Sequence, residues 1–168
     1  MNIPQIDTER LILRAFRESD LTAYAAMCAD PDVMKYIGYG RILSRSESWH
    51  SMATHLGHWH LRGYGLWAVE EKSTGLFVGR VGLFNPEGWP GQEIGWTLAK
   101  PYWGKGYGTE AAKAAIQWGF AHTSTKQLIS LIVPESTASI KVSERLGQKF
   151  SQQVIVKGVK ANLYILNR

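Results

Sequence analysis

The sequence predicts a mixed α/β fold in a single domain spanning residues 1–168. Apolar residues recur at every second position in some segments and at every third or fourth position in others, which is typical of strands and helices in one chain. Turn-forming residues separate these segments. With 168 residues and 45% hydrophobic composition, the chain is long enough for one core and short for two.

The first elements are a strand and two helices. Residues 10–14 (RLILR) form the predicted strand. Ser19 or Asp20 can cap a helix that runs to about Ala29, where the proline within residues 30–32 breaks it.

The second helix is predicted to begin after Ser44 and to end at Gly63. Its apolar positions recur at three- and four-residue intervals, at Trp49, Met52, Ala53 and Leu56. Trp49 and Trp59 are expected in the core or in the wall of a groove, and the core is the preferred interpretation.

Three strands follow. Residues 64–70 and 77–84 flank Ser73-Thr74-Gly75, which indicates a hairpin, and residues 92–98 follow a polar loop at 85–91. The chain then continues with a helix, a strand, a helix that ends at Gly147, and two strands. Their predicted ranges are about 106–121, 128–133, 137–146, 150–156 and 161–166.

The composition narrows the function only slightly. Nineteen Lys and Arg against fourteen Asp and Glu give a formal net charge of +5, which suits an anionic ligand but is ordinary for a soluble protein. No run of five basic residues occurs, so nucleic-acid binding is a distant alternative. Cys28 is alone, and no apolar run approaches the roughly 18 residues of a membrane span. We therefore expect a cytoplasmic protein without a membrane partner.

One segment, residues 101–112 (PYWGKGYGTEAA), carries three glycines at alternate positions before a predicted helix, namely Gly104, Gly106 and Gly108. Glycines let backbone N–H groups approach a ligand, and a helix N-terminus adds partial positive charge, so this segment predicts a phosphate site. The alternative is a plain strand-to-helix turn, which one glycine would satisfy. Neither the nucleotide P-loop nor the dinucleotide fingerprint fits, because Gly106 follows Lys105 and Thr109 stands where a glycine is needed.

Five segments carry a wider pattern: RLILR (10–14), DPDVMKYIG (30–38), EIGWTL (93–98), PYWGKGYGTEA (101–111) and PESTASIKVSERLG (134–147). In order and spacing they resemble the GNAT N-acetyltransferases, and within them the branch of the RimJ and RimL ribosomal-protein acetyltransferases. The resemblance covers nearly the whole chain. It implies a GNAT fold with a central, largely antiparallel sheet flanked by helices, acetyl-CoA as the acyl donor, and no metal.

The resemblance also implies where acetyl-CoA binds. The amides of the glycine loop would hold the pyrophosphate, through Trp103, Gly104, Lys105, Gly106, Tyr107, Gly108 and Thr109. The backbone of Trp96 and Leu98 would pair with the pantetheine arm. The Lys105 side chain either adds charge or is simply solvated. Trp103 replaces the superfamily's Arg or Gln, as is common in this branch, and Ser136 stands where an Asn usually helps to hold the pantetheine.

The implied reaction is the attack of an amine on a thioester, which needs a base, stabilisation of an oxyanion, and a hydrogen bond or proton for the leaving thiolate. Period-two alternation places Ile94, Trp96 and Leu98 on one face of their strand and Glu93, Gly95 and Thr97 on the other. Glu93 thus lies on the strand implied to bind the cofactor, where family members often carry a base. A solvated carboxylate at a strand end is the alternative.

Ser139 falls in the first turn of the last helix, on the inward face with Val142 and Leu146. It matches a serine that serves the thiolate in this branch, and a local backbone hydrogen bond is the alternative role. Because Cys28 is far in sequence from the cofactor loop, direct transfer is expected rather than an acyl-enzyme route.

In this fold the amine enters opposite the cofactor, which here implies residues 36–41 and 157–160, with Tyr36, Tyr39 and Trp89 as acceptor-binding residues. These segments hold no cluster of carboxylates, so we expect one amine beside apolar or peptide-like structure and not a polycation. No metal is expected at the three clustered histidines, His55, His58 and His60. His55 and His58 share a helix face that His60 does not, and no Cys or acidic residue is adjacent.

The sequence therefore predicts an acetyl-CoA-dependent N-acetyltransferase acting on a primary amine of a protein N-terminus, a peptide or a small molecule. A non-catalytic acyl-CoA-binding or sensing module is the main alternative. Fold-level resemblance identifies the donor better than the acceptor. A monomer and a homodimer are both compatible with the sequence.

Overall fold

The computed structural model describes residues 3–168. The strands are β1 (Ile6–Asp7), β2 (Leu11–Arg14), β3 (Leu66–Glu71), β4 (Phe77–Phe84), β5 (Glu93–Leu98), β6 (Gln127–Ile132), β7 (Lys149–Val156) and β8 (Val159–Asn167). The α-helices are α1 (Leu21–Cys28), α2 (Pro31–Met34), α3 (Arg45–Arg62), α4 (Tyr107–His122) and α5 (Thr137–Arg145). Short 3-10 helices lie at Glu18–Asp20 and Lys100–Tyr102.

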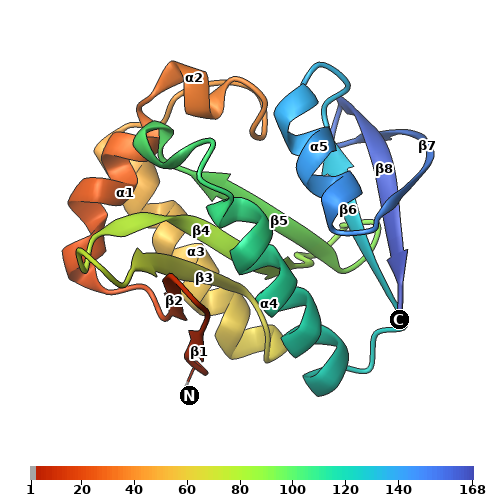
Figure 1. Ribbon diagram of the computed structural model, residues 1–168. Coiled ribbons are helices and arrows are strands. Elements are labelled where there is room, and N and C mark those ends of the chain that lie inside the picture. The colour runs from red at the N-terminus through yellow and green to blue at the C-terminus, as the bar shows by residue number, and fades with distance from the viewer. Residues whose placement is uncertain (1–2) are drawn as a thin grey trace.

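The strands form one eight-stranded sheet in the order β1-β2-β3-β4-β5-β6-β8-β7 (Figure 1). All neighbouring strands are antiparallel except β5 and β6, which are parallel. The predicted mixed α/β fold with a largely antiparallel sheet is therefore confirmed. That the whole chain is one domain stays a prediction.

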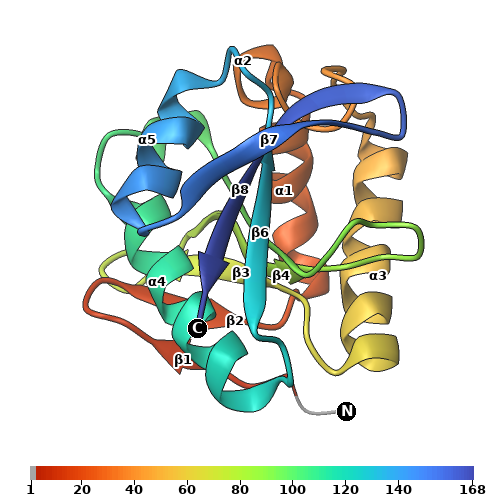
Figure 2. The same cartoon turned by 90° about the vertical axis from the view of Figure 1, so that its right-hand side faces the viewer.

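Helices cover both faces of the sheet. Figure 2 shows α4 and α5 on one side of the strands and α1 and α3 on the other. Small residues let α4 sit close to the sheet, since Ala111, Ala112 and Ala115 are fully buried in one core with Leu83 and Ile94. The second core lies under α1 and α3 and contains Phe16, Tyr24, Met52 and Phe77. Within residues 3–168, none of the helices combines the length and the apolar character that crossing a membrane requires.

The bounds of α3 are close to the predicted ones. Ser44 caps it and forms a capping box with Glu47, and Gly63 ends it with a left-handed φ of 76°. The preferred core position of Trp59 is confirmed at 2% exposure, whereas that of Trp49 is wrong, because Trp49 is 46% exposed.

The inward face of α3 is offset from its apolar pattern. Of the four apolar positions only Met52 is buried, and the buried set is Ser48, Met52, His55, His58 and Trp59. His58 can face inward because both of its ring nitrogens make hydrogen bonds there, whereas only the Nε2 of buried His55 does so.

The short elements β1 and α2 and the two 3-10 helices were not predicted. The break at residues 30–32 begins a new helix, because Asp30 accepts a hydrogen bond from the Asp32 N–H and Pro31 occupies the first turn.

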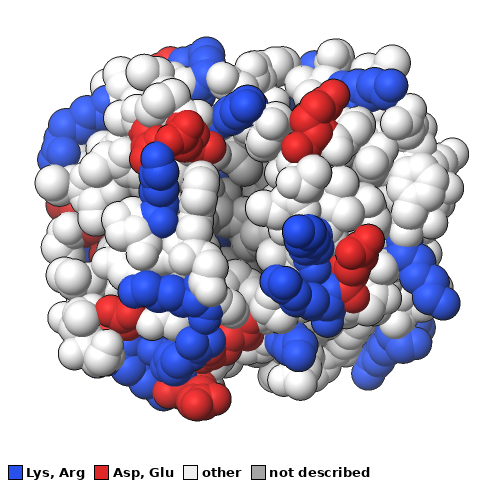
Figure 3. All heavy atoms as spheres, turned by 45° about the horizontal axis from the view of Figure 1, so that its top comes forward, with Lys and Arg blue, Asp and Glu red and all other residues white. Residues whose placement is uncertain are grey.

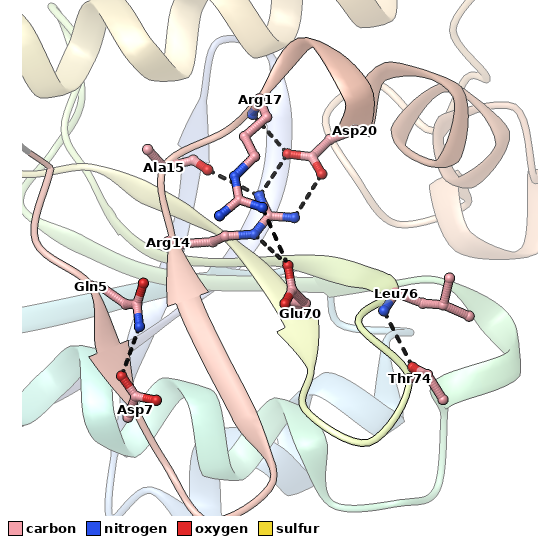
Figure 4. A network of polar contacts seen from close by, with 9 residues as sticks. All are labelled: Gln5, Asp7, Arg14, Ala15, Arg17, Asp20, Glu70, Thr74 and Leu76. Atoms are coloured by element: carbon pink, nitrogen blue, oxygen red, sulfur yellow. Dashed lines mark hydrogen bonds and ion pairs between the residues drawn. The ribbon is translucent and has the colours of Figure 1, made fainter.

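Asp20 precedes α1, but its carboxylate makes no capping hydrogen bond to that helix. It instead pairs with buried Arg14, whose Nη1 and Nη2 each lie 2.8 Å from an Asp20 oxygen (Figure 4). The Nε of Arg14 also donates to Glu70 Oε2 at 2.7 Å. The buried network therefore joins β2 and β3 to the start of α1.

Candidate active site

The candidate site begins where β5 and β6 separate. The two strands share a single register pair, Glu93 opposite Ile129, and diverge beyond it (Figure 1). The carbonyl of Gln92 accepts from Ile129 N, and the carbonyl of Ile94 accepts from Ser130 Oγ at 2.7 Å. Even-numbered residues of β5 thus turn their carbonyls toward β6.

By the same alternation, Trp96 and Leu98 turn their backbone carbonyls into the gap between the strands. This is the edge at which the sequence predicted an extra, strand-like partner. The Leu98 carbonyl already accepts a 2.8 Å hydrogen bond from the indole Nε1 of Trp103, so the tryptophan of the glycine loop reaches back to β5.

A cavity of about 440 Å³ lies at this gap, and the surface at this end of the molecule is visibly hollowed (Figure 3). It is lined by residues of β4, β5, β6, α3, the start of α5, the segment after α2 and the β7–β8 turn. Segments far apart in sequence therefore share one concave surface, as ligand sites in proteins usually require.

The cavity brings together seven of the fifteen predicted site residues. Both predicted catalytic residues and all three predicted acceptor-binding residues line it: Glu93, Ser139, Tyr36, Tyr39 and Trp89. Trp96 and Ser136, predicted to bind the cofactor, line it as well. Leu98 and the predicted loop residues 103–109 lie outside this cavity, at the end of β5 and the start of α4.

Glu93 is held in place by two hydrogen bonds. Its Oε2 accepts from the Trp89 indole at 2.8 Å, and its Oε1 accepts from the Leu131 N–H at 3.1 Å. Burial raises the pKa of Glu93 to about 7, although these two hydrogen bonds and the charge of Arg80 act in the opposite direction. Its remaining exposed surface lines the cavity, so Glu93 is not a solvated carboxylate at a strand end.

Two serines near the start of α5, Ser136 and Ser139, line the cavity. Ser136 is buried at the N-cap position but makes no capping hydrogen bond. Ser139 is partly buried, and within residues 3–168 its hydroxyl has no hydrogen-bond partner. The local backbone hydrogen bond considered as its alternative role is therefore not formed. Val142 packs against the core and Leu146 is buried in it, which confirms the inward face of α5.

The glycine loop has the backbone shape that its sequence predicted at two positions. Gly104 and Gly106 have φ values of +75° and +80°, which side-chain-bearing residues rarely adopt. Gly108 differs from these two, because it lies within α4, where it is buried and has no left-handed φ. A Cβ added there would lie 3.7 Å from Leu98 Cδ1 and 4.0 Å from Trp96 Cδ1, which are ordinary van der Waals contacts, so neither the backbone nor the packing requires a glycine at this position.

A polar network that the sequence analysis did not anticipate braces this loop. Glu110 accepts hydrogen bonds from Thr8 Oγ1 at 2.7 Å and from the Arg10 backbone N–H at 2.8 Å, and it pairs with the Arg10 guanidinium at 2.7 Å. Arg10 Nη1 also donates to the Lys105 carbonyl at 2.9 Å. Because about 100 residues separate the partners, no local pattern could identify the network.

The side chains of Lys105 and Tyr107 differ in their surroundings. The Tyr107 ring is buried, and its hydroxyl donates to Glu71 Oε1, so only the backbone of Tyr107 is available to a ligand at the loop. Lys105 Nζ is exposed and lies 5.2 Å from the centre of the Tyr102 ring.

The three histidines form no metal centre. His58 Nδ1 lies 2.8 Å from the Tyr64 carbonyl, and its Nε2 accepts from the Asn85 N–H, which identifies a neutral ring. His55 is also buried, and His60 is exposed. No set of three or more His, Cys, Asp or Glu side chains among residues 3–168 is grouped so that it could hold a metal ion.

Comparison with known proteins agrees with this geometry. The family model for the acetyltransferase (GNAT) domain matches residues 10–149. The uncharacterized protein YkkB of Bacillus subtilis is 34% identical over 155 residues, which cover 88% of this chain and 86% of YkkB. The uncharacterized N-acetyltransferase YnaD of the same organism is 28% identical over 156 residues, covering 91% of this chain and 89% of YnaD.

Solved structures share the whole fold. An acetyltransferase from Agrobacterium tumefaciens superposes with a TM-score of 0.89 at 28% identity, covering 100% of this chain and 96% of the other. RimL, a ribosomal L7/L12 alpha-N-protein acetyltransferase solved in complex with coenzyme A, superposes with a TM-score of 0.81 and covers 98% of both chains. At 16% identity, the second match shows a common fold only.

Proposed function

Because this chain belongs to the GNAT acetyltransferase family, we propose that it transfers the acetyl group of acetyl-CoA directly to a primary amine, with Glu93 as the base and Ser139 as the donor to the leaving thiolate. One observation carries the proposal: a carboxyl with a pKa of about 7 lines the cavity at the point where β5 and β6 part. A base works best when its pKa lies near the working pH.

The residues around the gap fit acetyl-CoA, which when bound supplies the activated thioester. The free backbone edge of β5 at Trp96 suits the amides of a pantetheine arm, because it can be paired as a neighbouring strand would be. The N-terminus of the 16-residue helix α4 and the left-handed glycines before it suit a pyrophosphate. Ser136 would meet the pantetheine with a hydroxyl in place of the amide usual in this branch.

The proton of the attacking ammonium would move to the Glu93 carboxylate. At neutral pH a substantial fraction of Glu93 is ionised, because its pKa is about 7. The hydrogen bonds from Trp89 and Leu131 hold the carboxylate in one orientation and leave further lone pairs to accept this proton. Ser139 has its hydroxyl free to donate within the same cavity.

The state of the single cysteine supports direct transfer. Cys28 is buried on α1, is not part of the cavity lining, and burial raises the pKa of its thiol. A thiol without thiolate character is a poor acyl carrier. Its reduced state is compatible with the cytoplasmic location that we predict.

The acceptor is proposed to enter past Tyr36, Tyr39 and Trp89, near the β7–β8 turn. All three side chains line the cavity with Lys157, whose Nζ lies 5.4 Å from the centre of the Trp89 ring. The aromatic rings suit one amine beside apolar or peptide-like structure. A protein N-terminus, a peptide and a small molecule all satisfy this description. The enzyme is proposed to act as a monomer or a homodimer.

The test is thiol release from acetyl-CoA with a panel of amines that includes peptides, amino acids, aromatic amines and spermine. We expect release with at least one single-amine acceptor and none with spermine. Tight coenzyme A binding without release for any amine would favour the non-catalytic sensing module. Efficient use of spermine, with the other amines inert, would contradict the proposed acceptor surface.

A further inference from the structure

We propose that the acceptor carries, beside its amine, a carboxylate that Arg80 binds inside the cavity. This inference rests on the proposed function and specifies its substrate class: a free amino acid, or a peptide whose first residue is acidic. It starts from an arginine that the sequence analysis did not single out.

Arg80 lies near the middle of β4, on the face that carries the cavity. It stands opposite Thr97 of β5, while Glu93 stands opposite Phe84 at the end of the same two strands. Because side chains alternate, Arg80, Phe84, Glu93 and Thr97 all project from one face of the sheet. Arg80 and Glu93 therefore reach the same cavity from neighbouring strands.

The guanidinium of Arg80 is poorly satisfied by the protein. Its Nε is buried without a hydrogen-bond partner, and its Nη1 makes one long contact, 3.4 Å to His55 Nε2. Arg80 takes part in none of the ion pairs found among residues 3–168.

Arg14, by contrast, is a buried arginine with a structural role and is fully supplied with partners by the protein. That side chain donates to Asp20 and Glu70, two carboxylates, and to one carbonyl. Arg80 is partly exposed to the cavity, but its buried Nε lacks such a partner, and a buried N–H left without a hydrogen bond is costly. The contrast indicates that the partner of Arg80 comes from a ligand.

The groups near Arg80 do not supply a hydrogen-bonded anionic partner. Burial raises the pKa of Tyr24 and of Cys28 and lowers that of His55, so all three are neutral at pH 7. The charge of Arg80 lowers the pKa of Glu93, but no ion pair joins the two side chains among residues 3–168, and the Glu93 carboxylate accepts its hydrogen bonds from Trp89 and Leu131. His55 Nδ1 is itself buried without a partner.

A carboxylate matches this site in shape as well as charge. The planar guanidinium donates two parallel hydrogen bonds to the two oxygens of a carboxylate, which a neutral amide cannot accept as well. Arg80 and Glu93 project from positions four residues apart on paired strands, a backbone spacing of about 13 Å that two long side chains shorten. The proposed acceptor would place its carboxylate at Arg80 and its amine toward Glu93.

The experiment compares matched acids and amides. Thiol release is measured with a free amino acid and its α-amide, leucine and leucinamide, and with two peptides that differ only in an N-terminal Asp or Asn, on wild type, Arg80→Gln, Arg80→Lys and Arg45→Gln. Arg45 is the control because it is an exposed arginine outside the cavity lining. Thermal melting confirms that each variant is folded.

We expect wild type and Arg45→Gln to prefer the acid by about tenfold or more in kcat/KM, since hydrogen bonds between charged groups are the strong ones. Arg80→Gln should lose the preference through a higher KM for the acid alone, and Arg80→Lys should keep part of it. The free amino acids and the peptides separate the two sources of the carboxylate. Equal use of acid and amide by wild type, or a preference that survives in Arg80→Gln, would overturn the inference.

The failure of the proposed function would look different, because no amine of any kind would release thiol. In that case titration calorimetry with leucine, leucinamide and the two peptides still tests the Arg80 site. Acid-specific binding that Arg80→Gln abolishes supports the inference, and its absence in wild type overturns it.

Discussion

The indole Nε1 of Trp89 donates a 2.8 Å hydrogen bond to Oε2 of Glu93. Trp89 comes from the loop before β5 and was predicted only as an acceptor contact, yet it also orients the candidate base. Its hydrogen bond stabilises the ionised carboxylate and so lowers the pKa that burial raises.

Replacing Trp89 with Phe should therefore raise the pKa of Glu93 further. A base must be ionised to accept a proton, so the acid limb of the profile of kcat/KM against pH should move to higher pH. The measurement is that profile for wild type and Trp89→Phe. If the acid limb stays at the same pH and only the acceptor KM changes, Trp89 contacts the acceptor but does not influence the pKa of Glu93.

Replacing Glu93 with Gln should lower turnover by roughly 10²–10⁴-fold, the usual worth of a general base. Affinity for acetyl-CoA, measured by titration calorimetry, should change little, because the predicted contacts to the donor are made by other residues. Glu87→Gln is the matched control, since the Glu87 side chain in the same loop is 98% exposed and does not line the cavity. A loss similar to that of the control would remove Glu93 from the chemistry.

The substitution Glu93→Gln should also change how the free energy of unfolding depends on pH. The pKa of Glu93 is about 7 in the folded chain against a usual 4.5, so folding favours the protonated form. The stability associated with this proton is fully present below pH 4.5 and is lost as the pH rises through 7. One pKa unit corresponds to about 1.4 kcal/mol, so the loss in wild type reaches at most about 3.5 kcal/mol.

The melting temperature of Glu93→Gln should rise relative to that of wild type between pH 5 and pH 8, and the difference should reach several degrees at pH 8. Comparing the two proteins at each pH cancels the titration of all other groups. A difference in melting temperature that is independent of pH would mean that Glu93 has an ordinary pKa.

Gly104→Ala should weaken acetyl-CoA binding beyond its effect on the fold. Gly104 has φ near +75°, and a Cβ there meets nothing within 4 Å, so the substitution acts through backbone strain of about 1 kcal/mol or more. Gly63 is a matched control at the end of α3, with φ near +76° and equally open surroundings. Both variants should lose similar stability, and only Gly104→Ala should lose affinity in titration calorimetry. Equal affinity in both would count against a phosphate loop.

Ser139→Ala should reduce the rate of the chemical step and leave donor affinity nearly unchanged, because the hydroxyl makes no hydrogen bond within residues 3–168 that the fold would miss. Single-turnover measurements isolate that step. Ser151→Ala, at an exposed position of β7, is the control. A single-turnover rate that matches the control would assign Ser139 to packing only.

Much of the fold was determined by signals that lie within a few residues of one another. Ser44 with Glu47 and the left-handed Gly63 bound α3, and the left-handed glycines at 104 and 106 precede α4. Alternation along β5 correctly separated Glu93 from Ile94, because the pleat of a strand depends only on neighbouring residues. Such local preferences act whatever the rest of the chain does, and so the sequence alone could predict them.

Tertiary structure alone decided which polar groups are satisfied and which are not. Glu93 acquires its raised pKa from burial beside Trp89 and Leu131, and Glu110 finds Arg10 about 100 residues away. In the sequence, nothing distinguishes Arg80 from any other arginine in a strand. Only the folded structure shows that its Nε is buried without a hydrogen-bond partner. These properties depend on desolvation and on contacts between distant segments. No pattern of neighbouring residues carries that information, because it arises only when the strands and helices pack around the cavity.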